Sequence, residues 1–336
     1  MKLSKFLGIN LIIACLFTTG CNNATATSAI LNKPNPATPI ETPAPTPELE
    51  KETVQILDDS NTTFSVGYAD NATNKAMLTT YFADKNDTNS TEATDLGYIP
   101  IASYNDIQYY IKQDEDQIHV TIYSSTKGSN EFTPLTQKLR SVSKIIPTKN
   151  KLFFLGNDTD NGTNRLGVLN LETTGMAFWG DLGCDVGALA VNPTTEKVYF
   201  VTRDLFIGSD HIPNYELYET SFNFDQDNKI LSSSDRIDYL AVNPNDNNLL
   251  IVREPFEGEQ NGLYIRTNSF EGIDFTLPPQ RIELGGCVFS NDGRGLYSVA
   301  TVDNIPGVYF YNFDTKEYNL IVDLTGKEIN IMQPAL

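Results

Sequence analysis

Ala190-Val191-Asn192-Pro193 recurs 51 residues later as Ala241-Val242-Asn243-Pro244, and a short apolar run follows each copy. Related segments stand at comparable intervals on either side of this pair: Ile145-Ile146-Pro147, Val288-Phe289-Ser290 and, more weakly, Ile101-Ala102-Ser103. Repeats of roughly 40 to 50 residues that each hold several short strands are typical of β-propeller blades. The sequence therefore predicts an all-β fold, a β-propeller of four-stranded antiparallel blades.

The length of the repeat region predicts the size of the ring. Residues 53–336, divided by the repeat spacing, give a six-bladed propeller. The C-terminal Ile331-Met332-Gln333-Pro334 resembles the start of one more blade. We expect it to form the inner strand of the first blade beside strands near Thr63–Tyr68 and Ala76–Phe82, so that the ring closes without a free edge. A frayed C-terminal tail is the alternative.

The last repeat carries a family resemblance. Val288-Phe289-Ser290-Asn291-Asp292-Gly293 precedes a strand at Leu296 and an aliphatic–Tyr pair at Val308-Tyr309, and this unit resembles the WD40-like repeat of the TolB family. Asn291 stands where the family pattern has Pro. The resemblance extends more loosely over about residues 60–334. It implies a six-bladed propeller that binds proteins in the bacterial envelope, although the same repeat also forms the accessory domain of some serine peptidases.

Residues 1–20 have the features of a signal peptide. Lys2 and Lys5 precede the apolar run Phe6–Phe17, which is too short to span a bilayer. Thr18-Thr19-Gly20-Cys21 resembles the lipobox of bacterial lipoproteins, which implies that Cys21 is acylated, for instance with palmitate, and becomes the new N-terminus. Cleavage before Cys15 and an ordinary secretory leader are the alternatives. We expect an extracytoplasmic protein, at the cell surface or facing the periplasm, whose lipid anchor alone holds it on the membrane.

Residues 21–52 are predicted to be a flexible, disordered stalk. The segment is polar and rich in Thr, and six prolines lie between residues 34 and 47. Proline favours the extended polyproline II conformation, which gives a linker reach rather than a packed core. The stalk would hold the propeller away from the membrane.

The charge balance narrows the choice of partner. The chain carries 43 Asp and Glu against 24 Lys and Arg, a formal net charge of −19. Nucleic acids and anionic lipid headgroups both require a basic surface, so neither is an expected partner. We expect a monomer that binds a protein or peptide partner in the cell envelope.

Few residues suit catalysis by a nucleophile and a base. His119 lies in an alternating segment typical of a sheet, and Ser209-Asp210-His211 are three neighbours in one loop, which cannot easily align as a triad. No Gly-x-Ser-x-Gly motif is present. Cys184 and Cys287 belong to blades separated by one other blade, and whether they pair is left open. The sequence thus favours a protein that is not an enzyme.

No cofactor is expected, with calcium as the one alternative. Two loops offer oxygen ligands for this cation, the first through Asp158, Asp160 and Asn161 and the second through Asp225, Asp227 and Asn228. Neither loop has the spacing of an EF-hand, and ordinary turns capped by Asp or Asn explain both equally simply. Trp179, the single tryptophan, is expected to serve packing.

Charged residues precede the predicted inner strands, and the alignment of blades places them near one mouth of a central channel: Arg140, Asp185, Arg236, Asp238 and Glu283. This ring is the candidate ligand-binding site of a non-catalytic module. The simpler explanation of these charged residues is that they only solvate the channel mouth. The alternative function is a hydrolase or lyase at the channel mouth that uses Asp238, Glu283 and a divalent metal, as in six-bladed propellers resembling lactonases.

Overall fold

The computed structural model divides the chain into two units, Met1–Thr53 and Val54–Leu336. It describes residues 62–82, 88–158, 163–180, 184–204, 214–243, 247, 249–254, 262–266, 272–276 and 282–334. The predicted signal peptide, Cys21 and the stalk lie outside these residues. Among the described residues, no helix has the length and apolarity needed to cross a membrane.

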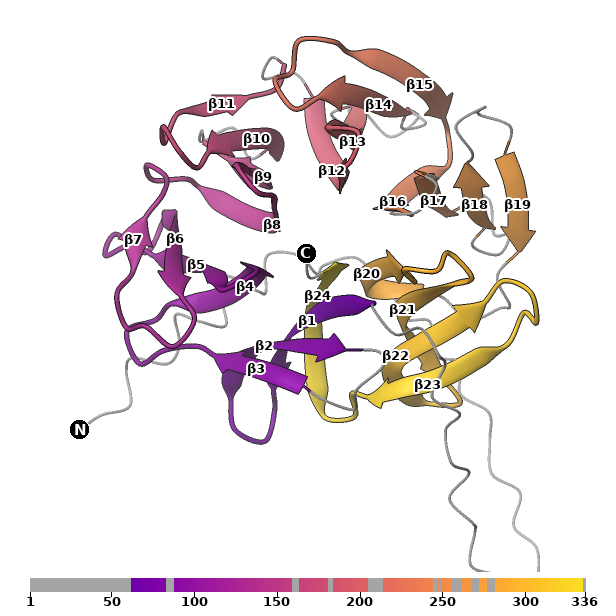
Figure 1. Ribbon diagram of the computed structural model, residues 1–336, viewed down its shortest axis with the longest axis horizontal. Helices are drawn as coiled ribbons and strands as arrows, with labels where there is room; N and C mark the ends of the chain where they lie inside the picture. The colour runs from indigo at the N-terminus through magenta and orange to yellow at the C-terminus, as the bar shows by residue number, and fades with distance from the viewer. Residues whose placement is uncertain are drawn as a thin grey trace, which may run out of the picture. The chain divides into compact units, whose positions relative to one another are not determined.

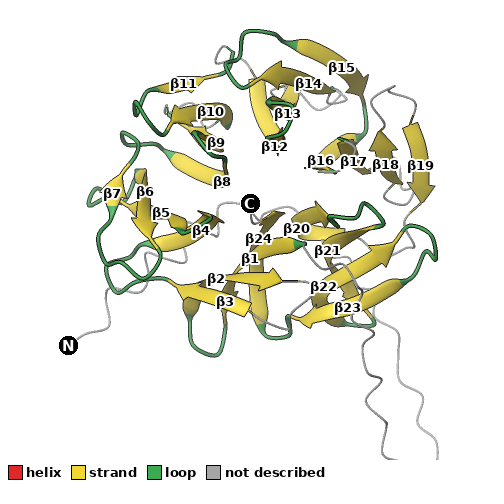
Figure 2. Ribbon diagram, in the orientation of Figure 1, coloured by secondary structure: helices red, strands yellow, loops and turns green. Residues whose placement is uncertain are grey.

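The described strands form six four-stranded sheets in which every neighbouring pair is antiparallel (Figures 1 and 2). The first blade combines β24 (Lys327–Pro334), β1 (Thr63–Asp70), β2 (Lys75–Phe82) and β3 (Thr88–Glu92). The second contains β4 (Ile99–Tyr104), β5 (Ile107–Gln113), β6 (Val120–Thr126) and β7 (Thr133–Pro134). The third contains β8 (Ser141–Pro147), β9 (Lys151–Asn157), β10 (Arg165–Asn170) and β11 (Met176–Phe178).

The remaining three blades follow the same order from the inside outward. The fourth contains β12 (Cys184–Asn192), β13 (Lys197–Asp204), β14 (Tyr215–Ser221) and β15 (Asn228–Ser233). The fifth contains β16 (Arg236–Val242), β17 (Leu249–Glu254), β18 (Gly262–Arg266) and β19 (Gly272–Thr276). The sixth contains β20 (Ile282–Phe289), β21 (Gly295–Val302), β22 (Ile305–Asn312) and β23 (Tyr318–Asp323). The prediction of a β-propeller with four-stranded antiparallel blades is confirmed.

The repeated Ala-Val-Asn-Pro segment ends an inner strand and starts a tight turn. Asn192 closes β12, and its Oδ1 accepts hydrogen bonds from the backbone N–H groups of Thr194 and Thr195 at 3.0 and 3.2 Å. Its Nδ2 donates to Oδ1 of Asn247, in the corresponding turn of the fifth blade, at 2.6 Å. The repeated Asn is therefore both a turn former and a contact between neighbouring blades.

The C-terminal strand closes the ring. β24 pairs with β1 so that Pro334 lies opposite Phe64 and Met332 opposite Val66. The predicted closing strand is confirmed, and the alternative of a frayed tail is wrong. The approach of β24 to the sixth blade is close at Gly286, which has a φ of +99° and whose added Cβ would lie 3.0 Å from the Met332 carbonyl oxygen. Only glycine adopts this conformation without strain.

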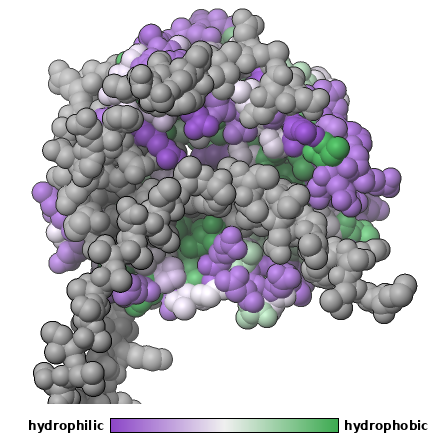
Figure 3. All heavy atoms as spheres, turned by 180° about the vertical axis from the view of Figure 1, so that it is seen from behind, coloured by the Kyte–Doolittle hydropathy of each residue, from purple (hydrophilic) through white to green (hydrophobic). Residues whose placement is uncertain are grey.

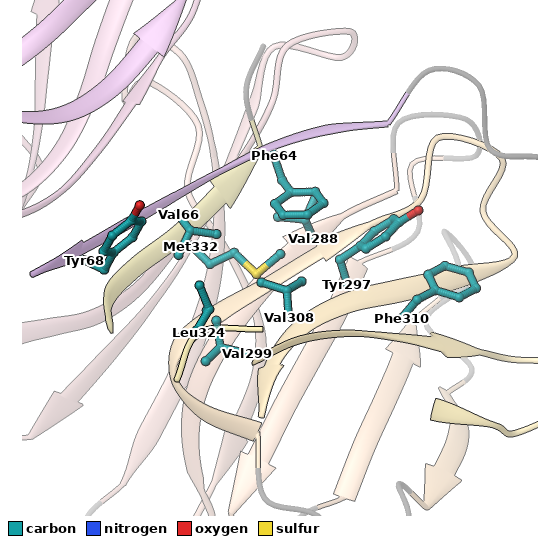
Figure 4. Packing of buried hydrophobic residues seen from close by; sticks show 10 residues of the cluster. All are labelled: Phe64, Val66, Tyr68, Val288, Tyr297, Val299, Val308, Phe310, Leu324 and Met332. Atoms are coloured by element: carbon teal, nitrogen blue, oxygen red, sulfur yellow. The ribbon is translucent and has the colours of Figure 1, made fainter. Parts of the chain in front are cut away.

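The hydrophobic core lies between blades. Phe64, Val66 and Met332 of the first blade point toward Val288 and Tyr297 of the sixth (Figure 4). Similar apolar clusters join the second blade to the third, the third to the fourth, the fourth to the fifth and the fifth to the sixth. Because each cluster uses two blades, no single repeat can bury its own apolar face.

Each inner strand deviates from regular pairing near its beginning. In β8 the register shifts between Val142 and Lys144, and in β12 it shifts between Val186 and Ala188. Comparable shifts occur in β4, β16 and β20, and in the pairing of β24 with β1. A β-bulge leaves at least one residue without a partner in the ladder. Each inner strand also pairs on one side only, so its other edge has no partner within its own sheet.

Candidate functional site

The five predicted channel-mouth residues lie at one end of the propeller. We call this end the entry end, because every inner strand begins there. Arg140 immediately precedes β8, and the other four lie within the first three residues of their strands: Asp185 in β12, Arg236 and Asp238 in β16, and Glu283 in β20. Arg140 and Arg236 are exposed, while the side chains of Asp238 and Glu283 lie outside the described residues.

Asp185 is engaged inside the protein. Its side chain is 6% exposed. Oδ1 accepts a hydrogen bond from the backbone N–H of Asn164 at 2.7 Å, and Oδ2 forms an ion pair with the guanidinium of Arg203. Asn164 belongs to the third blade and Arg203 to β13 of the fourth, so the Asp185 carboxylate joins two blades. This contact explains why an acidic residue stands at the start of this inner strand.

An Asp185→Ala variant is expected to lose about 2 kcal/mol of unfolding free energy, because the partly buried Asn164 N–H and the half-exposed Arg203 guanidinium lose their acceptor. Urea denaturation followed by circular dichroism measures the change. Glu172→Ala, at an exposed turn of the third blade, is the control and should shift the free energy by less than about 0.5 kcal/mol. Equal stabilities of the Asp185→Ala variant and the wild type would rule out this role.

Lys144 is a site residue that the repeat pattern did not single out. It follows the bulge of β8, and its Nζ donates a hydrogen bond to the Leu189 carbonyl oxygen of β12 at 2.8 Å. The ammonium also interacts electrostatically with Cys287 of β20. Lys144 therefore lies among the inner strands of the third, fourth and sixth blades. A lysine directly before the apolar Ile145-Ile146 of an inner strand is the signal that could have identified it.

Burial changes the protonation of both groups. Burial lowers the pKa of Lys144 to about 8, because a desolvated charge is disfavoured, and Cys287 has a smaller, opposite effect. Burial likewise raises the pKa of the Cys287 thiol to about 12. Cys287 is a free cysteine that is 5% exposed, and the Cys184 side chain lies outside the described residues. Near pH 7, Lys144 is thus a cation beside a neutral thiol.

The two candidate cation loops use their carboxylates in contacts within the protein. Asp158 accepts hydrogen bonds from Nη1 of Arg165 at 3.0 and 3.2 Å. Asp227 accepts one from Trp179 Nε1 at 2.9 Å, and Asp225 accepts one from the Ser221 hydroxyl. Asn228 begins β15, whereas Asp160 and Asn161 lie outside the described residues. In the part of the chain that the structure describes, no three His, Cys, Asp or Glu side chains cluster as metal ligands would.

The predicted packing role of Trp179 is confirmed, and His119 occupies a turn. Trp179 lies edge-on to Phe200 with ring centroids 4.4 Å apart, between the third and fourth blades. His119 directly precedes β6 rather than lying within a strand, and its Nδ1 contacts Asp116 Oδ2 at 2.8 Å. Ser209, Asp210 and His211 lie outside the described residues.

The exposed apolar side chains share the entry end. Among the described residues, the large apolar side chains with the greatest exposure are Leu96 (66%), Ile118 (51%) and Ile305 (40%). Leu96 lies in the connection from β3 to β4, Ile118 between β5 and β6, and Ile305 at the β21–β22 turn. Because strands alternate in direction, all three connections emerge at the entry end. Seen from behind, hydrophilic residues cover much of the described surface, with smaller apolar areas between them (Figure 3).

Comparison with known proteins yields matches only among solved structures. No protein-family model and no curated protein matches the chain. TolB from Acinetobacter baumannii superimposes with a TM-score of 0.62 at 13% identity, over 82% of this chain and 67% of that chain. The propeller domain of the Trilobed protease from Pyrococcus furiosus superimposes with a TM-score of 0.54 at 11% identity, over 78% of this chain and 79% of that chain. That domain is described as having an open velcro topology.

A third similar structure is an oligogalacturonate lyase in complex with manganese, with a TM-score of 0.51 at 12% identity, over 78% of this chain and 74% of that chain. Identities this low relate folds and not functions. The ring of the present chain is closed by β24 and β1. By architecture the chain is therefore a β-propeller, similar in fold to TolB.

Proposed function

We propose that the protein is a non-catalytic binding module, anchored to a bacterial membrane through acylated Cys21, that binds a protein or peptide partner at the entry end of a six-bladed propeller. The observation that carries the proposal is the location of Leu96, Ile118 and Ile305 at this one end. Exposed apolar side chains surrounded by polar groups are typical of protein interfaces. The similarity in fold to TolB is consistent with a role outside the cytoplasm.

Ile118 lies beside a group of charged side chains. The neighbouring Asp116 carboxylate accepts the backbone N–H of Ile118, contacts His119 Nδ1 and pairs with Lys138 Nζ at 3.2 Å. These contacts, the Ile118 N–H first, hold the pKa of Asp116 well below its ordinary value. Asp116 is thus charged throughout the physiological range. An apolar centre with a charged rim is the arrangement found at binding hot spots.

The second candidate is a hydrolase or lyase at the entry end that uses Asp238, Glu283 and a divalent metal. Asp238 is the unpaired residue at the bulge of β16, and Glu283 lies in the irregular part of β20 on the adjacent blade. The manganese complex of the similarly folded lyase gives this alternative a specific form. Asp238→Ala and Glu283→Ala would each abolish such an activity, whereas binding of a protein partner would tolerate the loss of either carboxylate.

Site-specific cross-linking tests the binding proposal. A photoreactive phenylalanine at Leu96, Ile118 or Ile305 should give the same discrete adduct in cells that produce the protein natively. The control positions Glu172 and Glu196 are exposed turn residues at the opposite end and should give no such adduct. Adducts of equal yield from both ends, or none from the entry end, would contradict the proposal.

The anchor is tested in the same cells. The wild type should sediment with membranes, and mass spectrometry should find acyl chains on Cys21. A Cys21→Ala variant should appear in the soluble extracytoplasmic fraction while keeping its circular dichroism spectrum. Wild-type protein that carries an unmodified Cys21, or that appears in the soluble fraction, would exclude the lipid anchor.

A further inference from the structure

We propose that Lys144 anchors a binding site for a small carboxylate ligand among the inner strands of the third, fourth and sixth blades. The site is separate from the protein-binding surface proposed above, and neither proposal depends on the other. Three features carry it: the hydrogen-bonding capacity of the Lys144 ammonium, the open space beside it, and the absence of a carboxylate partner within the described residues.

The first feature is unused donor capacity. A lysine ammonium has three N–H donors. The Leu189 carbonyl oxygen accepts one of them at 2.8 Å, and no second acceptor for Lys144 occurs in the residues that the structure describes. Two donors are therefore available to a ligand. A carboxylate, with two oxygens and a negative charge, is the small group that matches them best.

The second feature is open space at the bulges. Gly187 is the unpaired residue of β12, two positions before Leu189, and a Cβ built on it would have no atom within 4 Å. Gly187 is exposed, as is Ser143, the unpaired residue of β8 next to Lys144. Part of Lys144 itself stays accessible to solvent. A small molecule can thus approach the ammonium along the bulges of β8 and β12, where Ser143 and Gly187 have no partner in the strand ladder.

The third feature is the missing counter-charge. A buried cation is costly unless an opposite charge compensates it. Among the described residues, Cys287 is the ionisable group that interacts with Lys144, and its burial keeps it protonated. A cation that lacks a carboxylate partner among the described residues favours an anionic ligand.

Binding should depend on the protonation of Lys144. With a pKa of about 8, the amine is mostly protonated at pH 7 and only a few per cent protonated at pH 9.5. Apparent affinity falls with the fraction of binding-competent protein. A carboxylate is therefore expected to bind about 30-fold more weakly at pH 9.5 than at pH 7.

The experiment is isothermal titration of the purified protein with acetate and succinate at pH 7 and pH 9.5. Acetamide and succinamide are neutral ligands of nearly the same size, and inorganic phosphate is a different anion. We expect a carboxylate to bind at pH 7, the amides not to bind, and the affinity to fall at pH 9.5. Lys144→Met and Lys144→Gln should both abolish binding.

Lys151→Met is the matched control. Lys151 also donates to a backbone carbonyl, that of Phe222 at 2.8 Å, but on β9 of the third blade, where Asn223 Oδ1 is a further acceptor. This variant should bind carboxylates as the wild type does. The proposal is overturned if neither carboxylate binds at pH 7, if the amides or phosphate bind equally well, or if folded Lys144 variants retain binding. Cross-linking from Ile118 should be unchanged in these variants, so that failure of one proposal is distinguishable from failure of the other.

Discussion

A Lys144→Met variant should be more stable than the wild type at pH 7, by about 2 kcal/mol. The pKa of Lys144 is lowered from 10.5 to about 8 in the folded protein, and each pKa unit corresponds to roughly 1.4 kcal/mol. Burying the cation thus costs about 3 kcal/mol, from which we subtract about 1 kcal/mol for the hydrogen bond to Leu189. Methionine fills similar volume without a charge.

The pH dependence of the stability difference between Lys144→Met and the wild type identifies the origin of the added stability. Between pH 8 and 10.5 the unfolded chain binds the extra proton and the folded protein does not, so the Lys144 penalty is complete below pH 8 and disappears as the pH rises through 10.5. The stability difference between variant and wild type should therefore shrink between pH 7 and pH 10. Urea denaturation at each pH measures it, with Lys151→Met as control. A difference that is independent of pH would show that Lys144 is not a buried cation.

The second large effect is expected at the closing strand. Met332 is 2% exposed and packs against Phe64, Val66 and Val288. A Met332→Asp variant would place a carboxylate in this apolar junction, where no cation of the cluster can pair with it. We expect the free energy of unfolding to fall by more than about 4 kcal/mol, which is exceptional for one substitution. The ring should open between β24 and β1.

Hydrogen exchange and urea denaturation would test this expectation together. In the variant, the backbone amides of β1 should exchange faster than those of β9, which lies two blades away. Glu328→Ala, at an exposed position of the same strand, should change stability by less than about 0.5 kcal/mol. Protection of β1 that equals that of the wild type would mean that β24 does not hold the ring closed.

Features that depend on local sequence were predictable. Apolar runs flanked by Asn, Asp and Gly specify short strands and turns within a few residues, so the repeat at Asn192 and Asn243 identified the blades, and Ile331–Pro334 identified the closing strand. The beginnings of the inner strands were predictable for the same reason, and they brought Arg140, Asp185 and Arg236 to one end. Strand alternation and turn chemistry act between near neighbours in the chain.

Tertiary structure alone decided whether the charged residues of the inner strands are buried and how they are protonated. Asp185 was predicted as a ligand-site residue, but whether it faces solvent depends on Asn164 of the preceding blade, which the repeat pattern does not specify. Burial gives Lys144 its low pKa, and this burial arises among inner strands whose contacts with Lys144 include Leu189 and Cys287, 45 and 143 residues away in the chain. By itself, then, the sequence determined the blades and their closure, because these follow from short-range periodicity. Only the tertiary structure decided which charges are buried and which remain available, because burial is a property of the contacts between blades.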